Sequence, residues 1–240
     1  MKILSINQNS EEWLEFRKGK IGGSNSKTMK PLSRGADRTP QGVWTMLAER
    51  VADNAGGEAP IDRGHRLEAV AIAKLAEKYN LKLKAESCVW VSDSNDNIYV
   101  SPDGCEDSDQ PSWAAEAKCL SSANHLKFIY KDLVARVKDD YKGINSVPNE
   151  GTTWFRDQVI HYFVVNEHLQ TLYFVLYDDR ISPELGDYQM HVITVTRQEV
   201  QPEVDDQLAF QQQADNMVNQ LIAAFATHDK LPEFGFKKEG

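Results

Sequence analysis

Two acidic residues and a lysine lie close together near the middle of the chain. Asp103 stands in a Ser-Pro-Asp-Gly turn, and Glu116 and Lys118 belong to an apolar run that follows it. Strand side chains alternate between faces, so Glu116 and Lys118 are expected on one face and Ala117 on the other. Two carboxylates suit a hard divalent cation such as Mg²⁺. A lysine beside that cation could orient an attacking water or help to deprotonate it, which predicts a hydrolytic site.

Two predicted strands would position this cluster. The first covers residues 98–101 and ends in a turn that contains proline and glycine, and the second covers residues 113–119. Paired as a hairpin, they would place Asp103 beside Glu116. The spacing resembles the PD-(D/E)xK nuclease signature, although a Pro-Asp turn followed at this distance by Glu-x-Lys also arises by chance. The alternative is a surface hairpin whose glutamate and lysine are solvated.

A third carboxylate lies on the clearest predicted helix, residues 61–79. Glu68 shares a helical face with Ile72 and Leu75. A carboxylate held against a core is costly unless it is paired or binds a cation. Glu68 is therefore a candidate for the same site, and an ion pair with Arg66 or Lys118 is the alternative.

The first part of the chain carries candidate phosphate-binding residues. A predicted helix that contains Arg17 is followed by two glycines and by Ser24, which can cap a short helix. A helix N-terminus of this kind is a good place for a phosphate, and a glycine hinge between two helices is the alternative. Arg34 and Arg38 lie in the polar loop 30–40, where they could contact a nucleic-acid backbone or simply be solvated.

Cysteine content and hydropathy indicate the cellular compartment. The three cysteines are an odd number without CxxC spacing, which favours neither a disulfide framework nor a zinc site. An iron–sulfur cluster needs four cysteines. No apolar run approaches the roughly 18 residues of a membrane helix, and the first residues contain no apolar segment typical of a secretion signal. The sequence therefore predicts a protein of the cytoplasm with no membrane partner.

The charge balance limits the kinds of nucleic-acid binding that are expected. The formal net charge is −9, whereas a DNA-binding protein is more often basic. This argues against a simple nucleic-acid coat protein. An enzyme that confines positive charge to a groove remains compatible with the composition, because the local field matters more than net charge.

The order of predicted elements indicates the fold class. Helices come first, followed by three strands, two helices, two strands and a last helix, without an internal repeat or a low-complexity linker. This order predicts one α/β domain over residues 1–240, with a central mixed β-sheet flanked by helices on both sides. The helices outside the core are expected at about 10–55 and about 203–226, and the remaining predicted elements are helices 122–138 and 153–168 and strands 172–177 and 191–196.

Six short segments, taken in their order along the chain, extend the resemblance to known nucleases beyond the single motif around Asp103. They are EWLEFRKGKIGGSNS, RGHRLEAVA, SPDG, EAKC, DQVIHYFVV and YFVLYDDR, within about residues 11–197. Together they resemble the lambda-exonuclease (YqaJ-type) viral recombinase family, of the PD-(D/E)xK nuclease superfamily. The resemblance implies a restriction-endonuclease-like core and Mg²⁺-dependent 5′→3′ digestion of one strand of linear double-stranded DNA, which leaves 3′ single-stranded overhangs. It also implies a homotrimeric ring, a single-strand annealing protein as partner, and the host cytoplasm as location.

The resemblance also implies roles for individual residues. Two Mg²⁺ ions, with Mn²⁺ as a substitute, would be held by carboxylates and by one backbone carbonyl: Asp103, Glu116, Glu68 and the carbonyl of Cys119. Lys118 matches the catalytic lysine. The residues that would grip the 5′-terminal phosphate are Arg17, Ser24, Ser101 and Gln158.

Two other functional classes stay open on the sequence. One is a DNA endonuclease on the same core, which would cleave circular DNA. The other is a non-catalytic protein that binds DNA ends, which would show no Mg²⁺-dependent activity. The presence of Asp103, Glu116 and Lys118 argues against the second class.

Overall fold

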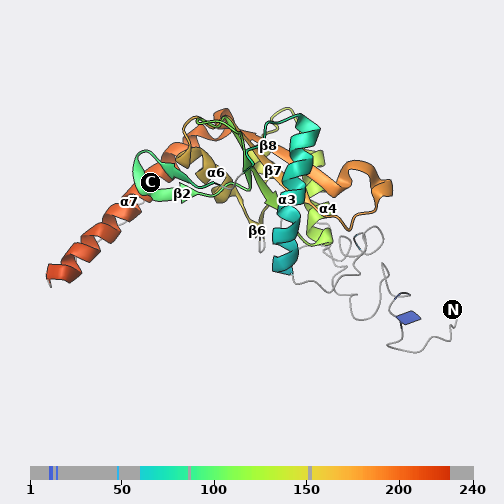
Figure 1. Cartoon of the computed structure of the whole chain (residues 1–240), viewed down its shortest axis with the longest axis horizontal. Helices are drawn as coiled ribbons and strands as arrows, with labels where there is room; N and C mark the ends of the chain where they lie inside the picture. Colours follow the sequence, from blue (N-terminus) through green and yellow to red (C-terminus); the bar gives the residue numbers. More distant parts are fainter. Residues whose placement is uncertain are drawn as a thin grey trace.

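The computed structural model describes residues 60–85, 88–150 and 153–227, together with residues 11, 12, 15 and 48. Residues 11, 12, 15 and 48 are helical, and the rest of the helices predicted between about 10 and 55 lies outside the described residues. The elements, shown in Figure 1, are α3 (Pro60–Tyr79), β1 (Trp90–Ser92), β2 (Asn95–Val100), β3 (Gly104–Cys105), β4 (Trp113–Lys118), α4 (Ser122–Arg136), α5 (Gly143–Ser146), β5 (Asn149–Glu150), β6 (Thr153–Trp154), α6 (Arg156–Val165), β7 (Thr171–Tyr177), the 3-10 helix η2 (Pro183–Gln189), β8 (Met190–Thr196) and α7 (Arg197–Thr227).

A four-stranded mixed sheet forms the centre of the molecule. Its strand order is β3-β4-β7-β8, in which β4 and β7 are parallel and the other two pairs are antiparallel. A parallel pair needs a long crossover connection, and α4, α5 and α6 supply it between β4 and β7. The predicted α/β class with a mixed sheet and flanking helices is confirmed.

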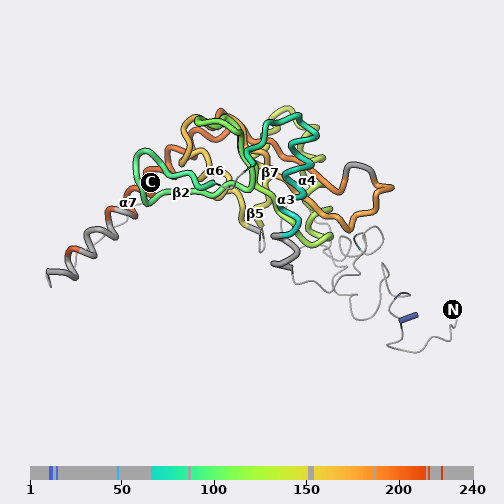
Figure 2. Tube along the Cα trace, in the orientation of Figure 1, coloured from blue at the N-terminus to red at the C-terminus, as the bar shows by residue number. Residues whose placement is uncertain are grey.

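Helices cover both faces of this sheet. On one face, α3 packs through Leu67, Ile72 and Leu75 against Ala115 and Ala117 of β4 and against Val175 of β7. The trace of α3 runs alongside β7 in Figure 2. On the other face, α6, α4 and the start of α7 enclose a larger core that includes Phe174 of β7. Among the described residues, no helix is long and apolar enough to cross a membrane.

The predicted hairpin between residues 98–101 and 113–119 is wrong in its pairing. Strand β2 pairs with β1 in a separate two-stranded sheet, and β4 pairs with β3 and β7 instead of with β2. A local hairpin through the turn at residues 93–94 closes a far shorter loop than the predicted one, so its entropic cost is lower. A Cβ at Gly104 would lie 2.5 Å from Ile72 Cγ2, so β3 approaches α3 closely only because this residue is glycine.

Two predicted helices have different bounds in the structure. Helix α6 is shorter than 153–168 because residues 153–154 pair with β5 as strand β6. Helix α7 begins at Arg197 rather than at about 203. Glu199 accepts a hydrogen bond from the backbone N–H of Thr196 at 2.6 Å, which is one half of a capping box. This cap starts the helix at Arg197, so that Pro202 lies inside it.

Candidate active site

Strand β4 places a glutamate and a lysine side by side. Lys118 Nζ forms an ion pair with Glu116 Oε1. Ala117 points to the opposite face, where it is fully buried against α3. The predicted alternation along this strand is therefore confirmed, and it delivers both functional groups to the face covered by α6.

Asp103 reaches the same place from the turn that precedes β3. Its Oδ2 atom accepts a hydrogen bond from the backbone N–H of Ala117 at 2.8 Å. The carboxyl therefore lies against β4 at Ala117, the residue that separates Glu116 from Lys118. The residue is exposed to solvent overall, whereas its carboxyl points inward to this backbone amide. Desolvation of the carboxyl raises the pKa of Asp103, and the neighbouring charge of Glu116 raises it further, to about 7. A pair of carboxylates that resists ionisation together is an arrangement that a cation would stabilise.

Glu116 is buried, and three donors surround its carboxylate. Only 3% of the residue is exposed. Gln158 Nε2 donates to Oε1 at 2.7 Å, the Tyr162 hydroxyl donates to Oε2, and Lys118 supplies the counter-charge. Burial raises the pKa of the Tyr162 phenol, and the charge of Glu116 raises it further, so the hydroxyl remains a donor. These contacts offset the desolvation of the carboxylate and fix its orientation.

Helix α6 supplies the groups that hold the cluster in place. Gln158 and Tyr162 are four residues apart, so they lie on one side of the helix and both reach Glu116. Just before the helix, the Phe155 ring lies 5.2 Å from Lys118 Nζ and 5.7 Å from the Phe174 ring. The ammonium of Lys118 is therefore held between a carboxylate and an aromatic face.

Helix α3 brings Glu68 into the same electrostatic environment. Glu68 is half-buried one turn before Ile72, the residue that packs on Gly104 beside Asp103. Its charge contributes, after those of Glu116 and Lys118, to the pKa of Asp103. Glu68 is thus near the cluster, as its helical face predicted.

The donor set suits a hard cation, although the site is not closed around one. Carboxylate oxygens from a turn and a strand are the ligands that Mg²⁺ prefers. Asp103 and Glu116 would hold the ion, with Glu68 and the carbonyl of Cys119 as further ligands. Within the described part of the chain, no three His, Cys, Asp or Glu side chains are already arranged around a metal position. A bound ion would therefore draw a third ligand inward.

Only some of the residues predicted to bind phosphate are among those that the structure describes. Ser101 Oγ donates to the carbonyl of Cys88 at 3.2 Å at the entrance of the Asp103 turn. Arg17, Ser24, Arg34 and Arg38 lie outside the described residues. The structure brings Gln158 to Glu116 rather than leaving its amide turned away from the cluster.

Comparison with known proteins now adds to this geometry. A family described as the YqaJ-like viral recombinase domain matches residues 12–148, which is more than half of the chain. The chain belongs to this family. The matched segment contains Glu68, Asp103, Glu116 and Lys118, so the whole acidic cluster lies within the YqaJ-like domain.

Solved structures with a similar fold include an exonuclease. The crystal structure of an alkaline exonuclease (LHK-Exo) from Laribacter hongkongensis is 21% identical, covers 91% of this chain and 99% of that chain, and has a TM-score of 0.49. The structure of LHK-Exo in complex with dAMP is 20% identical, with the same coverage and a TM-score of 0.50. At this identity the likeness concerns the fold. No curated protein matches the chain.

Sequence reasoning missed Tyr162 as a residue of the site. The helix around it is apolar nearly all round, and in that pattern a tyrosine is taken for core packing. The signal was its spacing of four residues from Gln158, which places a hydroxyl and an amide on one side of the helix. In this chain both groups donate hydrogen bonds to the buried carboxylate of Glu116.

Asp103→Asn is expected to stabilise the metal-free protein above neutral pH. The folded-state pKa of Asp103 is about 7, against 3.8 for the ordinary carboxyl. The folded protein thus binds its proton more tightly than the unfolded chain, so stability falls as pH rises from about 4 to about 7. Asparagine removes this penalty. Because solvent still reaches the residue, we expect only about 1 kcal/mol, or a Tm higher by about 2–4 °C at pH 8.

The measurement is thermal unfolding in a chelating buffer at pH 8 and pH 4. The gain should be present at pH 8 and much smaller at pH 4, where Asp103 is protonated in the folded wild type and the unfolded carboxyl is close to its ordinary pKa of 3.8. Addition of Mg²⁺ at pH 8 should raise the Tm of the wild type only. An Asp103→Asn protein that is less stable than wild type at pH 8 would disprove the proposed repulsion.

Proposed function

We propose that this chain is a Mg²⁺-dependent exonuclease that digests one strand of linear double-stranded DNA from its 5′ end. The product would be a duplex with 3′ single-stranded overhangs, ready for recombination by single-strand annealing. One PD-(D/E)xK nuclease domain would span residues 1–240, with the N-terminal helices and α7 packed on the core. The activity would be of the alkaline-exonuclease type.

The observation that carries this proposal is the convergence of Asp103, Glu116 and Lys118. Two neighbouring carboxylates, of which Asp103 has a raised pKa, and an adjacent ammonium are what phosphodiester hydrolysis with a divalent cation requires. Membership of the YqaJ-like viral recombinase family supports DNA as the substrate. The fold shared with an alkaline exonuclease, which has been solved in complex with dAMP, supports an exonuclease that releases mononucleotides.

Each residue of the cluster has a distinct task in this reaction. When bound, Mg²⁺ supplies Lewis-acid polarisation of the phosphate and a more acidic water. Asp103 and Glu116 hold it, with Glu68 and the carbonyl of Cys119 completing the set. Lys118 orients the attacking water and takes part in its deprotonation, because its ammonium lies next to the Glu116 carboxylate. Gln158 and Tyr162 donate hydrogen bonds that keep that carboxylate fixed in orientation.

A phosphate pocket next to the cluster would select the 5′ end. Arg17 and Ser24 would hold the terminal phosphate, because an arginine fork and a hydroxyl are suitable donors for it. Ser101 and Gln158 border the carboxylates and would define the inner wall of that pocket. Arg34 and Arg38 would contact the DNA backbone outside it.

A closed ring of three subunits would keep the enzyme on its substrate. A head-to-tail ring needs two different surfaces that fit each other. Two exposed apolar surfaces support this assembly: Tyr130 and Val134 on α4 with Val137 directly after it, and Tyr99 of β2 with Phe210 of α7. Light scattering should give about three times the 27.1 kDa chain mass, and a mass of one chain at micromolar concentration would refute the ring. A single-strand annealing protein would act on the product strand.

Digestion of defined DNA ends tests the function. The wild-type protein with Mg²⁺ should release label from the 5′ end of linear duplex, leave 3′-labelled strands long, and leave closed circular duplex intact. A duplex with a 5′-phosphate should be digested faster than one with a 5′-hydroxyl, and chelation should stop the reaction. Cleavage of circular DNA would instead support an endonuclease. Binding of ends without any Mg²⁺-dependent cleavage would support a non-catalytic protein.

A further inference from the structure

A second hollow lies at the edge of the sheet farthest from Asp103. It has a volume of about 440 Å³ and opens beside β8, the strand at the opposite end of the sheet from β3. Helices α3 and α4 and the 3-10 helix η2 form its walls together with β8. Its polar and aromatic lining consists of Lys78, Tyr79, Arg136, Tyr188 and His191. Met190 of β8 also lines it.

The lining of this β8-edge pocket is basic in an acidic protein. Its lining includes Lys78, Arg136 and His191, and none of the described residues that line it is acidic, although the chain carries a net charge of −9. Lys78 and Arg136 are cations at neutral pH, and two cations in one hollow against that background produce a local field that attracts anions.

A buried carboxylate behind the pocket fixes two of the basic groups. Asp132 is fully buried, and its Oδ2 accepts from Arg136 Nε at 2.5 Å and lies 2.7 Å from His191 Nε2. Tyr141 donates to its other oxygen at 2.7 Å. Arg136 Nη2 also donates to the carbonyl of Val192 at 2.9 Å. The arginine and the histidine are thus held in place before any ligand arrives, which lowers the entropic cost of binding one.

Two tyrosines supply the flat, partly apolar side of the pocket. Tyr79 and Tyr188 are 42% and 44% exposed, which leaves a large part of each ring open to a ligand. The Tyr79 ring packs 5.3 Å from the Tyr173 ring, so it is supported from behind. Basic groups for a phosphate and aromatic rings for a base are the two components of sequence-independent nucleotide binding.

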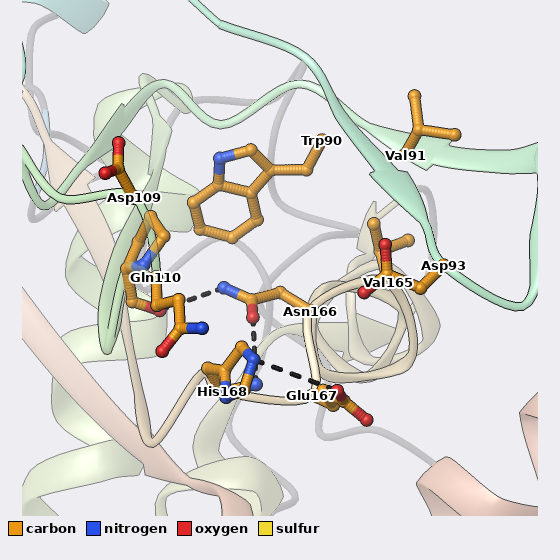
Figure 3. Close-up of a pocket in the computed structure, with 10 residues that line it drawn as sticks. Trp90, Val91, Asp93, Asp109, Gln110, Val165, Asn166, Glu167 and His168 are labelled. Atoms are coloured by element: carbon orange, nitrogen blue, oxygen red, sulfur yellow. Dashed lines mark hydrogen bonds and ion pairs between the residues drawn. The ribbon is translucent and has the colours of Figure 1, made fainter.

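A different pocket in the described part of the chain has an acidic rim instead. That hollow, of about 180 Å³, lies between β1 and the end of α6 (Figure 3). Its rim carries Asp93, Asp109 and Glu167, and Asn166 is engaged with Pro111 and with the backbone of His168. These carboxylates would repel a phosphate.

We propose that the β8-edge pocket binds a nucleoside 5′-monophosphate unit. The phosphate lies among Lys78, Arg136 and His191, and the base lies against Tyr79 and Tyr188. A volume of about 440 Å³ is within the usual range for a small-ligand site. The unit is either a free mononucleotide or a nucleotide within single-stranded DNA. Only the source of the nucleotide rests on the proposed function. In that function the free mononucleotide would be the product of digestion, and the single-stranded DNA would be the strand left behind.

Methionine-methyl NMR on the full-length, metal-free protein tests this site directly. The chain has five methionines, and the Met190 methyl, assigned with Met190→Leu, reports on the pocket. Titration with dAMP should shift this resonance saturably, whereas deoxyadenosine and inorganic phosphate should bind at least about tenfold more weakly. Lys78→Glu and Tyr188→Ala should each weaken dAMP binding about tenfold or more.

Lys82→Glu is the matched control, because Lys82 is an exposed lysine that pairs with Asp107 instead. It introduces the same charge change and should leave the dAMP titration of Met190 unaltered. An equal effect of Lys78→Glu and Lys82→Glu would overturn the site, as would a Met190 resonance that no phosphate-bearing ligand moves. A response to inorganic phosphate as strong as that to dAMP would overturn the nucleotide assignment.

A short single-stranded oligonucleotide separates the two sources of the ligand. If the oligonucleotide binds at least about tenfold more tightly than dAMP in the Met190 titration, and if Lys78→Glu removes this difference in affinity, the pocket holds the single strand. If dAMP binds as well or better, the pocket holds the free nucleotide, and either result supports the proposal. Because no metal is present and nothing is turned over, the outcome is independent of whether the nuclease proposal is correct.

Discussion

Asp103→Asn and Glu116→Gln are each expected to lower Mg²⁺-dependent digestion of linear duplex by about 10³-fold or more. Both residues would hold the ion, and its charge stabilisation in the transition state amounts to several kcal/mol, where each 1.36 kcal/mol is tenfold in rate. The amides keep the size of the native side chains. This matters most for Glu116, which is 3% exposed and accepts from Gln158 and Tyr162. Truncation to alanine would leave these donors buried without a partner and would confuse activity with folding.

Glu106→Gln is the matched control for both substitutions. Glu106 also lies in the β3–β4 region, where its Oε2 accepts from the backbone N–H of Ser112 at 2.6 Å and from the Ser112 hydroxyl at 2.8 Å. Its loss should alter stability rather than catalysis. End-labelled digestion gives the rate, and the shift of Tm by Mg²⁺ gives ion binding in the same proteins. Near-normal activity of folded Asp103→Asn or Glu116→Gln would remove that residue from the site.

The parts of the site that depend on local chemistry were predictable from the sequence. Alternation along a strand predicted that Glu116 and Lys118 lie together and that Ala117 faces a core, and helical spacing predicted the position of Glu68. These rules hold because a side chain's direction depends on its own backbone. The mixed sheet with helices on both faces followed from the order of the elements.

The parts that depend on pairing between distant segments were not predictable. The pairing of β4 with β3 was missed because β2 forms a local hairpin with β1 instead. The sequence of a strand alone does not determine which strand it pairs with. The contact of Asp132 with His191 joins residues 59 positions apart, so neither residue alone indicates the basic pocket. The Thr196 and Glu199 cap, by contrast, is a local sequence signal, a threonine followed three residues later by a glutamate, that the predicted start at about residue 203 missed.

Lys118→Met is expected to lower the rate of digestion by about 10²–10⁴-fold with little change in DNA binding. This is the range for loss of a group that moves or orients a proton in the transition state. The ammonium lies against Glu116 Oε1 and 5.2 Å from the Phe155 ring. In the proposed reaction it would face the attacking water at this position rather than the length of the duplex. Methionine keeps most of the chain's packing on Phe155 and removes only the charge. Single-turnover digestion with saturating enzyme measures this rate apart from binding.

Lys131→Met provides the comparison, since Lys131 is a half-buried lysine whose Nζ donates to Glu150 at 2.7 Å. It loses the same charge outside the cluster and should keep a rate within about threefold of wild type, as expected when only a partly exposed ion pair is lost. Lys118→Arg keeps a positive charge but carries a planar group in place of a compact ammonium, so it should recover only part of the rate. Full recovery with arginine would mean that Lys118 acts as a counter-charge for Glu116 alone. A rate for Lys118→Met equal to that of Lys131→Met would mean that the lysine has no part in the chemical step, and the attacking water would then depend on the carboxylates and the bound ion.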